Sequence, residues 1–327
     1  MSRNQHAIQK IVVDIPKDSN GYFNRWIGKY GNIKKFLSKL LCALIPVRIW
    51  RKQLQFILMY DPKPFHGFRE MLKSRAHKDF TYQLSILACL KNEADYIGEW
   101  IEYYKLMGVE HFYIYNNNST DNIEEVLTPY MEEGLVTLVE HPGLAMQTTM
   151  YAHALKHFRL ETKWLIIADI DEFMLPKSHA TLIDFVNAHS QYNQLITQWS
   201  LFGDSGHKKK PDGLVIENFV HKEAFSTCAY NTKVITRPSK TVTIGVHIST
   251  TSKSKICSLD EIQCNHYFTK SEEEYLTKKS ARGSVLAAAN RHTMDRYERF
   301  NKNEVYDDSM LQYVDKIKAA LAAKNRL

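Results

Sequence analysis

Residues 164–173 read Trp-Leu-Ile-Ile-Ala-Asp-Ile-Asp-Glu-Phe, an apolar run that ends in three acids spread over four residues. The apolar half has the length and composition of a strand that is buried on both faces. Carboxylates clustered at the end of such a strand repel one another unless a cation or close hydrogen bonds compensate. Because Mg²⁺ and Mn²⁺ suit oxygen ligands and leave positions for substrate phosphate, Asp169 and Asp171 predict a divalent cation site.

Three similar strands precede this stretch, and each is followed by a helical pattern. We expect strands at residues 83–90, 111–115 and 135–139, with helices between them and a further helix at residues 146–158. Short links between alternating strands and helices are typical of α/β proteins. The sequence therefore predicts a mainly parallel sheet that is covered by helices on both faces.

Polar clusters follow three of the predicted strands. They lie at residues 91–93, 116–121 and 169–172. Parallel strands end at the same edge of a sheet, and open α/β sheets bind their ligands at the carboxyl ends of the strands. We therefore expect the three clusters to form one site at that edge.

The positive charge of the chain is concentrated near its N-terminus. Residues 1–80 carry 16 Lys and Arg against 5 Asp and Glu, and the rest carries 27 against 31, so the net charge of +7 is the sum of +11 and −4. Residues 33–52 combine an apolar helical face with basic side chains, which is typical of a helix in the interface of an anionic membrane. A helix packed on the domain would show the same pattern. We divide the chain into a basic, largely helical extension that is a candidate for membrane association (1–80), an α/β domain (81–300) and a C-terminal helix (301–327).

The cysteines and the first residues indicate a cellular compartment. The five cysteines include no Cys-x-x-Cys pair, which argues against a disulfide framework and against a structural zinc site. The first 16 residues lack the apolar run of a secretory signal. We therefore expect a cytoplasmic protein that is peripheral at the inner face of the cytoplasmic membrane.

Several motifs, taken in order along the chain, resemble those of GT-A glycosyltransferases. The closest likeness is to family 2-type bacterial enzymes and to the related glycosyltransferase family 92. The motifs are residues 87–93 with 99–100, 108–109, 114–119, 164–173, 199–213, and 265–271 with 274–275 and 279–283. The resemblance covers about residues 82–285. It implies a GT-A fold, which is a Rossmann-like, mainly parallel sheet with flanking helices, here with a helical N-terminal extension.

The resemblance also implies ligands and residue roles. The donor would be a nucleotide-diphosphate sugar, such as a UDP-sugar, with bound Mn²⁺ or Mg²⁺ and inversion at the anomeric carbon. Asp171 would be the main metal ligand, and Asp169 would face the ribose or the metal. The residues expected to contact the nucleotide, its ribose or its diphosphate are Asn92, Glu93, Asn116, Asn118, Gln147, Lys270 and Arg282. The residues at 116–118 also suit a turn with a helix cap, and Glu93 also suits the first turn of a helix.

A late histidine and a carboxylate base complete the expected site. GT-A enzymes commonly supply a His to the metal or the diphosphate, and His266 is the first candidate here and His247 the second. Either could instead be an ordinary buried histidine. An inverting transfer needs a carboxylate to accept the proton of the acceptor hydroxyl. Asp204 is the first candidate, Glu217 the second and Glu172 the third.

These observations lead to one functional hypothesis and its rivals. We expect a hexosyltransferase that builds a cell-surface glycan, lipopolysaccharide or capsule, on a glycan or lipid-linked acceptor beside an anionic membrane. A nucleotidyltransferase would also bind a nucleotide through a divalent cation, but no Gly-rich phosphate loop follows the first predicted strand. A non-catalytic glycan-binding protein on a GT-A scaffold is the second rival. No nucleic-acid recognition motif is present, so nucleic acid is not an expected partner.

Overall fold

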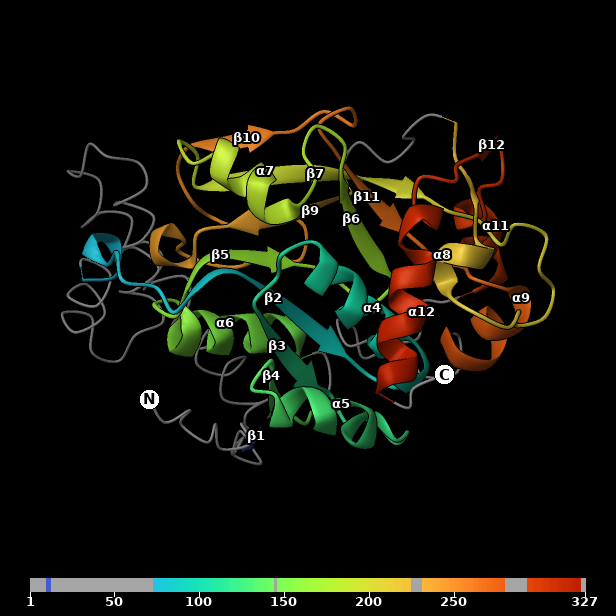
Figure 1. Cartoon of the computed structure of the whole chain (residues 1–327), viewed down its shortest axis with the longest axis horizontal. Helices are drawn as coiled ribbons and strands as arrows, with labels where there is room; N and C mark the ends of the chain where they lie inside the picture. The colour runs from blue at the N-terminus through green and yellow to red at the C-terminus, as the bar shows by residue number, and fades with distance from the viewer. Residues whose placement is uncertain (1–9, 13–72, 144–145, 225–230, 280–292, 325–327) are drawn as a thin grey trace, which may run out of the picture.

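The computed structural model of the chain describes residues 10–12, 73–143, 146–224, 231–279 and 293–324 (Figure 1). Most of the basic extension, including the predicted interfacial helix at residues 33–52, lies outside these residues, and so does Arg282. Among the residues that the structure describes, no helix combines the length and the hydropathy that crossing a bilayer would require.

The first half of the α/β region alternates between strand and helix as predicted. Its elements are β2 (Tyr82–Leu90), α4 (Ala94–Leu106), β3 (His111–Asn116), α5 (Ile123–Glu132), β4 (Val136–Glu140), α6 (Gln147–Phe158) and β5 (Thr162–Ile167). β2 is buried on both faces, because successive side chains of a strand point to opposite sides. Ile86 and Ala88 enter one apolar core, whereas Leu87 and Cys89 enter another.

One large sheet runs through the molecule. Its strand order is β1 (Lys10–Val12), β4, β3, β2, β5, β9 (Thr232–Thr236), β7 (Gln194–Leu201), β11 (Ile262–His266) and β6 (Glu172–Pro176), and β10 (Ser254–Ile256) pairs with β7. Among the described strands of this sheet, the pairs β5–β9, β9–β7 and β11–β6 are antiparallel and the other pairs are parallel. The predicted α/β fold with a mainly parallel sheet and flanking helices is therefore confirmed.

Helices cover both faces of this sheet. α4, α5, α7 (Leu182–Ala188) and α12 (Val314–Ala323) bury their apolar sides in one core, and α6 does so in the other. α12 lies beside α4 (Figure 1). The two helices meet at Gly98, where an added Cβ would lie only 3.1 Å from Leu321 Cδ2. α12 occupies only part of the segment 301–327 that was predicted as a C-terminal helix, and its Val314, Ile317 and Leu321 are all buried.

The order of the parallel strands reverses at β2. The chain builds outward from β2 through β3 to β4, and it then returns to add β5 on the opposite side of β2. Such a reversal of strand order is a topological switch point, where α/β proteins bind ligands at the carboxyl ends of the strands. β2 ends just before residues 91–93 and β5 ends just before the acids at 169–172. Two of the predicted polar clusters therefore flank this point.

The remaining elements are short and lie outside the large sheet. They are α8 (Val215–Asn218), β8 (His221–Lys222), the 3₁₀ turn η1 (Pro238–Lys240), α9 (Glu272–Glu274), the π-helical turn η2 (Tyr275–Lys279), α11 (Met294–Phe300), β12 (Val305–Tyr306) and the 3₁₀ turn η3 (Leu311–Tyr313). β8 and β12 pair as a small antiparallel sheet. The predicted domain boundaries at residues 80 and 300 stay predictions.

Candidate active site

Side chains of α4 donate hydrogen bonds to the backbone of the acidic turn, residues 169–172, which joins β5 to β6. Trp100 and Tyr104 lie one helical turn apart and so share a face of α4. The Trp100 indole N–H donates to the carbonyl oxygens of Asp169 and Glu172, each at 3.1 Å. The Tyr104 hydroxyl also donates to the Glu172 carbonyl, at 3.1 Å. The backbone that carries the acids is therefore fixed before any ligand binds.

Strand pairing brings a histidine to these acids. β6 and β11 are antiparallel neighbours, and their register places His266 directly opposite Glu172. Side chains opposite each other in such a pair lie on the same face and within contact. His266 Nε2 lies 3.4 Å from Asp171 Oδ1. Candidate ligand atoms of Asp171, Glu172 and His266 all lie within 4.8 Å of one another, and all three residues are buried.

The chemistry of this group fits a divalent cation. Glu172 is fully buried, and its Oε1 atom has no hydrogen-bond partner within the described part of the chain. An unpaired carboxylate oxygen in the interior is strongly unfavourable, and a metal ion is one of the few partners that would satisfy it. Mg²⁺ favours oxygen ligands, whereas imidazole suits transition metals. Two carboxylates and one imidazole therefore form a donor set that suits a divalent cation.

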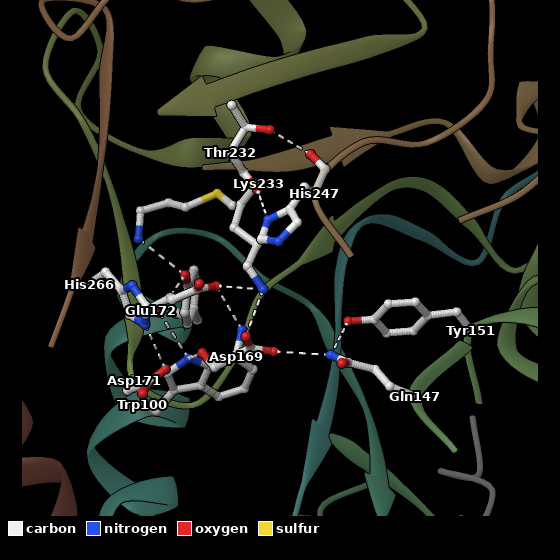
Figure 2. A network of polar contacts seen from close by, with 12 residues as sticks. Trp100, Gln147, Tyr151, Asp169, Asp171, Glu172, Thr232, Lys233, His247 and His266 are labelled. Carbon is white, nitrogen blue, oxygen red and sulfur yellow. Dashed lines mark hydrogen bonds and ion pairs between the residues drawn. The ribbon is translucent and has the colours of Figure 1, made fainter. Parts of the chain in front are cut away.

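A buried lysine neutralises part of the acidic turn (Figure 2). Lys233 Nζ lies 2.8 Å from Asp169 Oδ2 and 3.1 Å from Glu172 Oε2, and its side chain is 0% exposed. Burial alone would lower the pKa of Lys233, but the attraction of Asp169 and Glu172 raises it well above the usual value. Burial raises the pKa of Glu172 to about 8, although attraction to Lys233 opposes this shift.

Sequence reasoning missed Lys233. It lies in the β9 sequence Thr-Lys-Val-Ile-Thr, a short strand of β-branched residues. A lysine is almost never fully buried unless it is paired. A lysine within an apolar strand was thus the available signal, but its partner could not be identified without knowing which strands flank β9.

Asp169 lies at the rim of this group rather than inside it. Its side chain is 34% exposed, compared with 8% for Asp171 and 0% for Glu172. Gln147 Nε2 lies 3.5 Å from Asp169 Oδ1 and also donates to the Tyr151 hydroxyl at 2.9 Å (Figure 2). The structure therefore brings Gln147 close to Asp169. The third member of the compact ligand group is Glu172, in place of Asp169.

His247 is held apart from the three clustered ligands. Its Nδ1 lies 3.1 Å from the carbonyl oxygen of Thr232, and the Thr232 hydroxyl donates to the His247 carbonyl at 2.7 Å. Burial lowers the pKa of His247, so the ring is neutral near pH 7. The Trp199 ring contacts both histidines, with centroid distances of 5.5 Å to His247 and 4.1 Å to His266. The geometry favours His266 over His247 as a ligand.

The two polar loops that follow β2 and β3 meet as predicted. The Ser119 hydroxyl accepts the Asn92 N–H at 2.9 Å, and Asn92 Oδ1 accepts the Thr120 N–H at 2.7 Å. Asn92 and Asn118 both adopt positive φ, at 56° and 54°, which asparagine tolerates better than most residues. Loops that are stiffened in this way present their polar groups at one edge of the sheet.

Other predicted nucleotide contacts have protein partners. Asn116 is buried, and its Nδ2 donates to both Glu140 oxygens at 3.1 and 3.0 Å. Asn118 is exposed and Glu93 is buried at the N-cap position of α4. These contacts suit the alternative in which Asn116 orders the turn. Asn118, at the surface of the loop, is the better placed of the two to meet a ligand.

Lys270 occupies an unusual position beyond β11. It is buried, has φ of 49°, and its ammonium lies 4.0 Å from the centroid of the Tyr96 ring. The Tyr96 hydroxyl in turn donates to Glu274. A lysine held in left-handed backbone conformation is uncommon, and such positions cluster at functional sites. The structure thus places a cationic side chain beside the start of α4.

Asp204, the first predicted base, is fully engaged by hydrogen bonds. Oδ2 accepts from the Tyr297 hydroxyl at 2.6 Å and from Asn301 Nδ2 at 2.9 Å. Oδ1 accepts from Asn303 Nδ2 at 3.0 Å and from the Gly206 N–H at 2.9 Å. Burial would raise the pKa of Asp204, but these hydrogen bonds lower it below its usual value. A carboxylate with occupied lone pairs is a weak base, so this arrangement favours a structural role.

Glu217, the second predicted base, joins two helices. Its Oε1 lies 2.6 Å from Lys318 Nζ, and its Oε2 accepts the Leu214 N–H at 3.3 Å. The hydrogen bond from Lys318 lowers the pKa of Glu217. Glu217 therefore connects α8 to α12, and the structure does not bring it into the group of Asp171, Glu172 and His266.

Comparison with known proteins identifies the family. The model of glycosyltransferase family 92 matches residues 78–316, which is more than half of the chain. The chain belongs to glycosyltransferase family 92. A family 92 protein of Oryza sativa subsp. japonica is 32% identical over 155 residues, covering 46% of this chain and 26% of the relative. A family 92 protein of Ricinus communis is 33% identical over 142 residues, covering 40% of this chain and 25% of the relative.

The family 92 chain spans about a quarter of the length of these curated relatives. They are plant proteins, so the likeness to family 2-type bacterial enzymes stays a prediction. Among solved structures, S. aureus TarS 1–349 in complex with UDP is similar at 12% identity, with a TM-score of 0.38 over 74% of this chain and 72% of that chain.

Proposed function

We propose that this family 92 chain is a metal-dependent glycosyltransferase that moves a sugar from a nucleotide-diphosphate donor to a hydroxyl group. One observation carries the proposal. Asp171, Glu172 and His266 form a buried ligand group in which Glu172 Oε1 has no hydrogen-bond partner among the described residues. The group follows β5, beside the switch point where α/β sheets bind ligands.

The donor diphosphate has a natural position at this group. Asp171, Glu172 and His266 would hold the cation, and a bound Mn²⁺ or Mg²⁺ supplies charge that stabilises a diphosphate leaving group. Lys270, at the same edge, would add a second positive charge beside the phosphates. Asp169, which is partly exposed, would accept a hydrogen bond from a ribose hydroxyl, and Gln147 would orient it.

The transfer step follows from the chemistry of the donor. The acceptor oxygen forms a bond to the anomeric carbon as the bond from that carbon to the diphosphate oxygen breaks. The acceptor proton passes to a base, and the nucleotide diphosphate leaves. We propose inversion, as the family resemblance implies. Asp204 and Glu217 stay candidate bases, although their hydrogen bonds and lowered pKa values disfavour both.

The acceptor and the location of the protein are further proposals. We propose a glycan or lipid-linked acceptor at a cell surface, as in lipopolysaccharide or capsule synthesis, and attachment to an anionic membrane on the cytoplasmic side. The support is the basic, amphipathic pattern of residues 33–52. Deletion of residues 1–52 should lower sedimentation of the chain with anionic liposomes. Unchanged sedimentation would favour a helix packed on the domain.

The decisive experiment measures release of nucleotide from donor sugars. The full chain is incubated with a panel of nucleotide-diphosphate sugars in Mn²⁺, in Mg²⁺ and in EDTA. We expect hydrolysis or transfer with one donor in Mn²⁺, its loss in EDTA and its loss in Asp171→Asn. Asp260→Asn, at an exposed acid, is the matched control. Activity that survives both EDTA and Asp171→Asn would exclude the proposed metal role.

The same assay separates the rival functions. A nucleotidyltransferase would form pyrophosphate from a nucleoside triphosphate and a sugar phosphate, and it would release no nucleoside diphosphate from donor sugars. A binding protein on the same scaffold would show a ligand-induced rise in melting temperature without turnover.

A further inference from the structure

We propose that Lys233 is a positioning residue that acts as the internal counter-ion of the acidic turn and leaves one Glu172 oxygen for the cation. The inference rests on the proposed function, because it concerns the same site. Lys233 lies on β9, which pairs antiparallel with β5, and the register sets Val234 opposite Ile167. Lys233 is thus opposite residue 168, one residue before the acids begin.

The acids have two different partners: Asp169 and Glu172 pair with Lys233, and Asp171 and Glu172 group with His266. Lys233 engages Asp169 Oδ2 and Glu172 Oε2, which lie at opposite ends of the acidic turn. Glu172 Oε2 also accepts the Asp169 N–H at 2.9 Å. With Oε2 occupied twice, Oε1 is the Glu172 oxygen left for the group that it forms with Asp171 and His266 (Figure 2). Lys233 therefore orients Glu172 without taking its second oxygen.

The charges suggest why a lysine is needed here. When Asp169, Asp171 and Glu172 are ionised, one lysine and one divalent cation bring the charge of the group to zero. Without the lysine, three carboxylates would crowd one turn and repel one another in a medium of low polarity. The acidic turn would then depend on the cation for its stability. With the lysine, the turn is ordered before the cation arrives.

A purely structural ion pair makes a different prediction. If Lys233 only neutralises Asp169 and Glu172, its loss should destabilise the protein equally with and without metal. If it shares the acids with a cation, its loss should increase the stabilisation that a cation provides, because the remaining negative charge attracts the cation more strongly. The dependence on metal is thus the readout that separates the two roles.

The test uses thermal unfolding of the full chain in EDTA and across a MnCl₂ titration. The variants are the wild type, Lys233→Met, Lys233→Arg and the control Lys222→Met. Lys222 pairs with Asp307 at 2.5 Å, and neither residue belongs to the three-residue ligand group. We expect Lys233→Met to melt lower in EDTA and to show a Mn²⁺-induced rise about twofold larger than that of the wild type. Lys233→Arg should resemble the wild type, and Lys222→Met should melt lower by the same amount in both conditions.

Two outcomes overturn different claims. If the wild type is stabilised by Mn²⁺ and Lys233→Met is stabilised to the same extent, Lys233 is an ordinary ion pair and the inference fails while the metal site stands. If Mn²⁺ stabilises none of the variants, the proposed metal site fails and the inference fails with it.

A second variant covers the case in which Lys233→Met does not fold. Lys233→Met combined with Asp169→Asn removes one positive and one negative charge, so the balance is restored. We expect this double variant to fold and to respond to Mn²⁺ as the wild type does. If the double variant is also unfolded, with and without Mn²⁺, the lysine is needed for packing rather than for charge, and the inference fails.

Discussion

Two buried acids follow strands of the same sheet, and their surroundings differ in one decisive respect. Glu172 begins β6 after the turn from β5, and Asp204 follows β7. All the hydrogen-bonding positions at Asp204 that the structure shows are filled by donors of the protein, four in number. Glu172 Oε1 has none within the described residues. A buried acid with a missing partner indicates a ligand site, and a saturated one indicates a structural junction.

The pKa values follow the same division. Hydrogen bonds to Asp204 outweigh its burial and lower its pKa. Burial of Glu172 outweighs the attraction of Lys233 and raises its pKa. Both acids are nearly inaccessible to solvent, but Asp204 lies less deep in the protein than Glu172, so its four donors and its shallower position together keep its pKa low. A substitution that removes a donor from Asp204 should therefore raise its pKa toward the behaviour of Glu172.

The largest expected effect is on catalysis, from Asp171→Asn. Asparagine keeps the size of the side chain and removes the charge that a cation requires. We expect transfer to fall on the order of 10³-fold, which corresponds to about 4 kcal/mol of transition-state stabilisation. The free energy of unfolding in EDTA should stay the same or rise, because a repulsive charge is lost. Donor turnover and urea unfolding of the same preparation measure the two quantities.

Asp204→Asn is the matched test on the other side of the comparison. The new amide N–H₂ group must face donors from Tyr297 and Asn301, or from Asn303 and Gly206. We expect the free energy of unfolding to fall by about 2–4 kcal/mol. Turnover per folded molecule should change little. A loss of turnover comparable to that of Asp171→Asn, with stability intact, would restore Asp204 as the base.

Glu99 provides an intermediate case. It is buried on α4 and, within the described part of the chain, accepts two hydrogen bonds, from the N–H groups of Val215 at 2.8 Å and Ile216 at 3.0 Å. Burial raises its pKa to about 7, despite these two donors. Two donors are thus too few to keep this deeply buried carboxyl at its usual pKa, whereas Asp204, with four donors and a shallower position, has a lowered pKa.

This shift predicts a pH dependence of stability. The unfolded chain releases the Glu99 proton near pH 4.5 and the native chain near pH 7, so the native state binds more protons in between. The free energy of unfolding therefore falls as the pH rises across this interval. Glu99→Gln should abolish this fall. Its amide N–H₂ group must face the N–H of Val215 or Ile216, so the variant should be less stable than the wild type at pH 4 and should regain up to about 3 kcal/mol relative to it by pH 8. Urea unfolding at several pH values tests this, and a difference that is independent of pH would contradict it.

The sequence predicted the local parts of this comparison better than the distant ones. The strand predicted at residues 164–168, observed as β5 at 162–167, and the acids after it could be identified, because burial and composition are properties of neighbouring residues. The meeting of the loops at 91–93 and 116–121 followed from the rule that parallel strands end at one edge. His266 could be named as a candidate, but its position opposite Glu172 depends on the register of β6 and β11.

The unpredicted parts arise from contacts between distant segments. Lys233 reaches the acids because β9 is inserted antiparallel between β5 and β7, and no local pattern specifies that insertion. Asp204 was the first candidate for the base in the sequence analysis. Its donors Tyr297, Asn301 and Asn303 lie far along the chain, so its saturation was invisible in the sequence. Local patterns can thus locate acids, whereas distant partners decide what each acid does.

Tyr297→Phe has the smallest expected effect, and it separates a catalytic role of Asp204 from a structural role most directly. The substitution removes one donor, at 2.6 Å from Asp204 Oδ2, and keeps the ring that packs against Tyr275. We expect the free energy of unfolding to fall by about 1–2 kcal/mol. Because the lost hydrogen bond favoured the ionised carboxylate, the pKa of Asp204 must rise. A catalytic Asp204 would then shift the acidic limb of the pH–rate profile upward, since a base must be ionised to act. A structural Asp204 would leave that limb unchanged while stability alone decreases, so the pH–rate profile of this variant decides between the two roles.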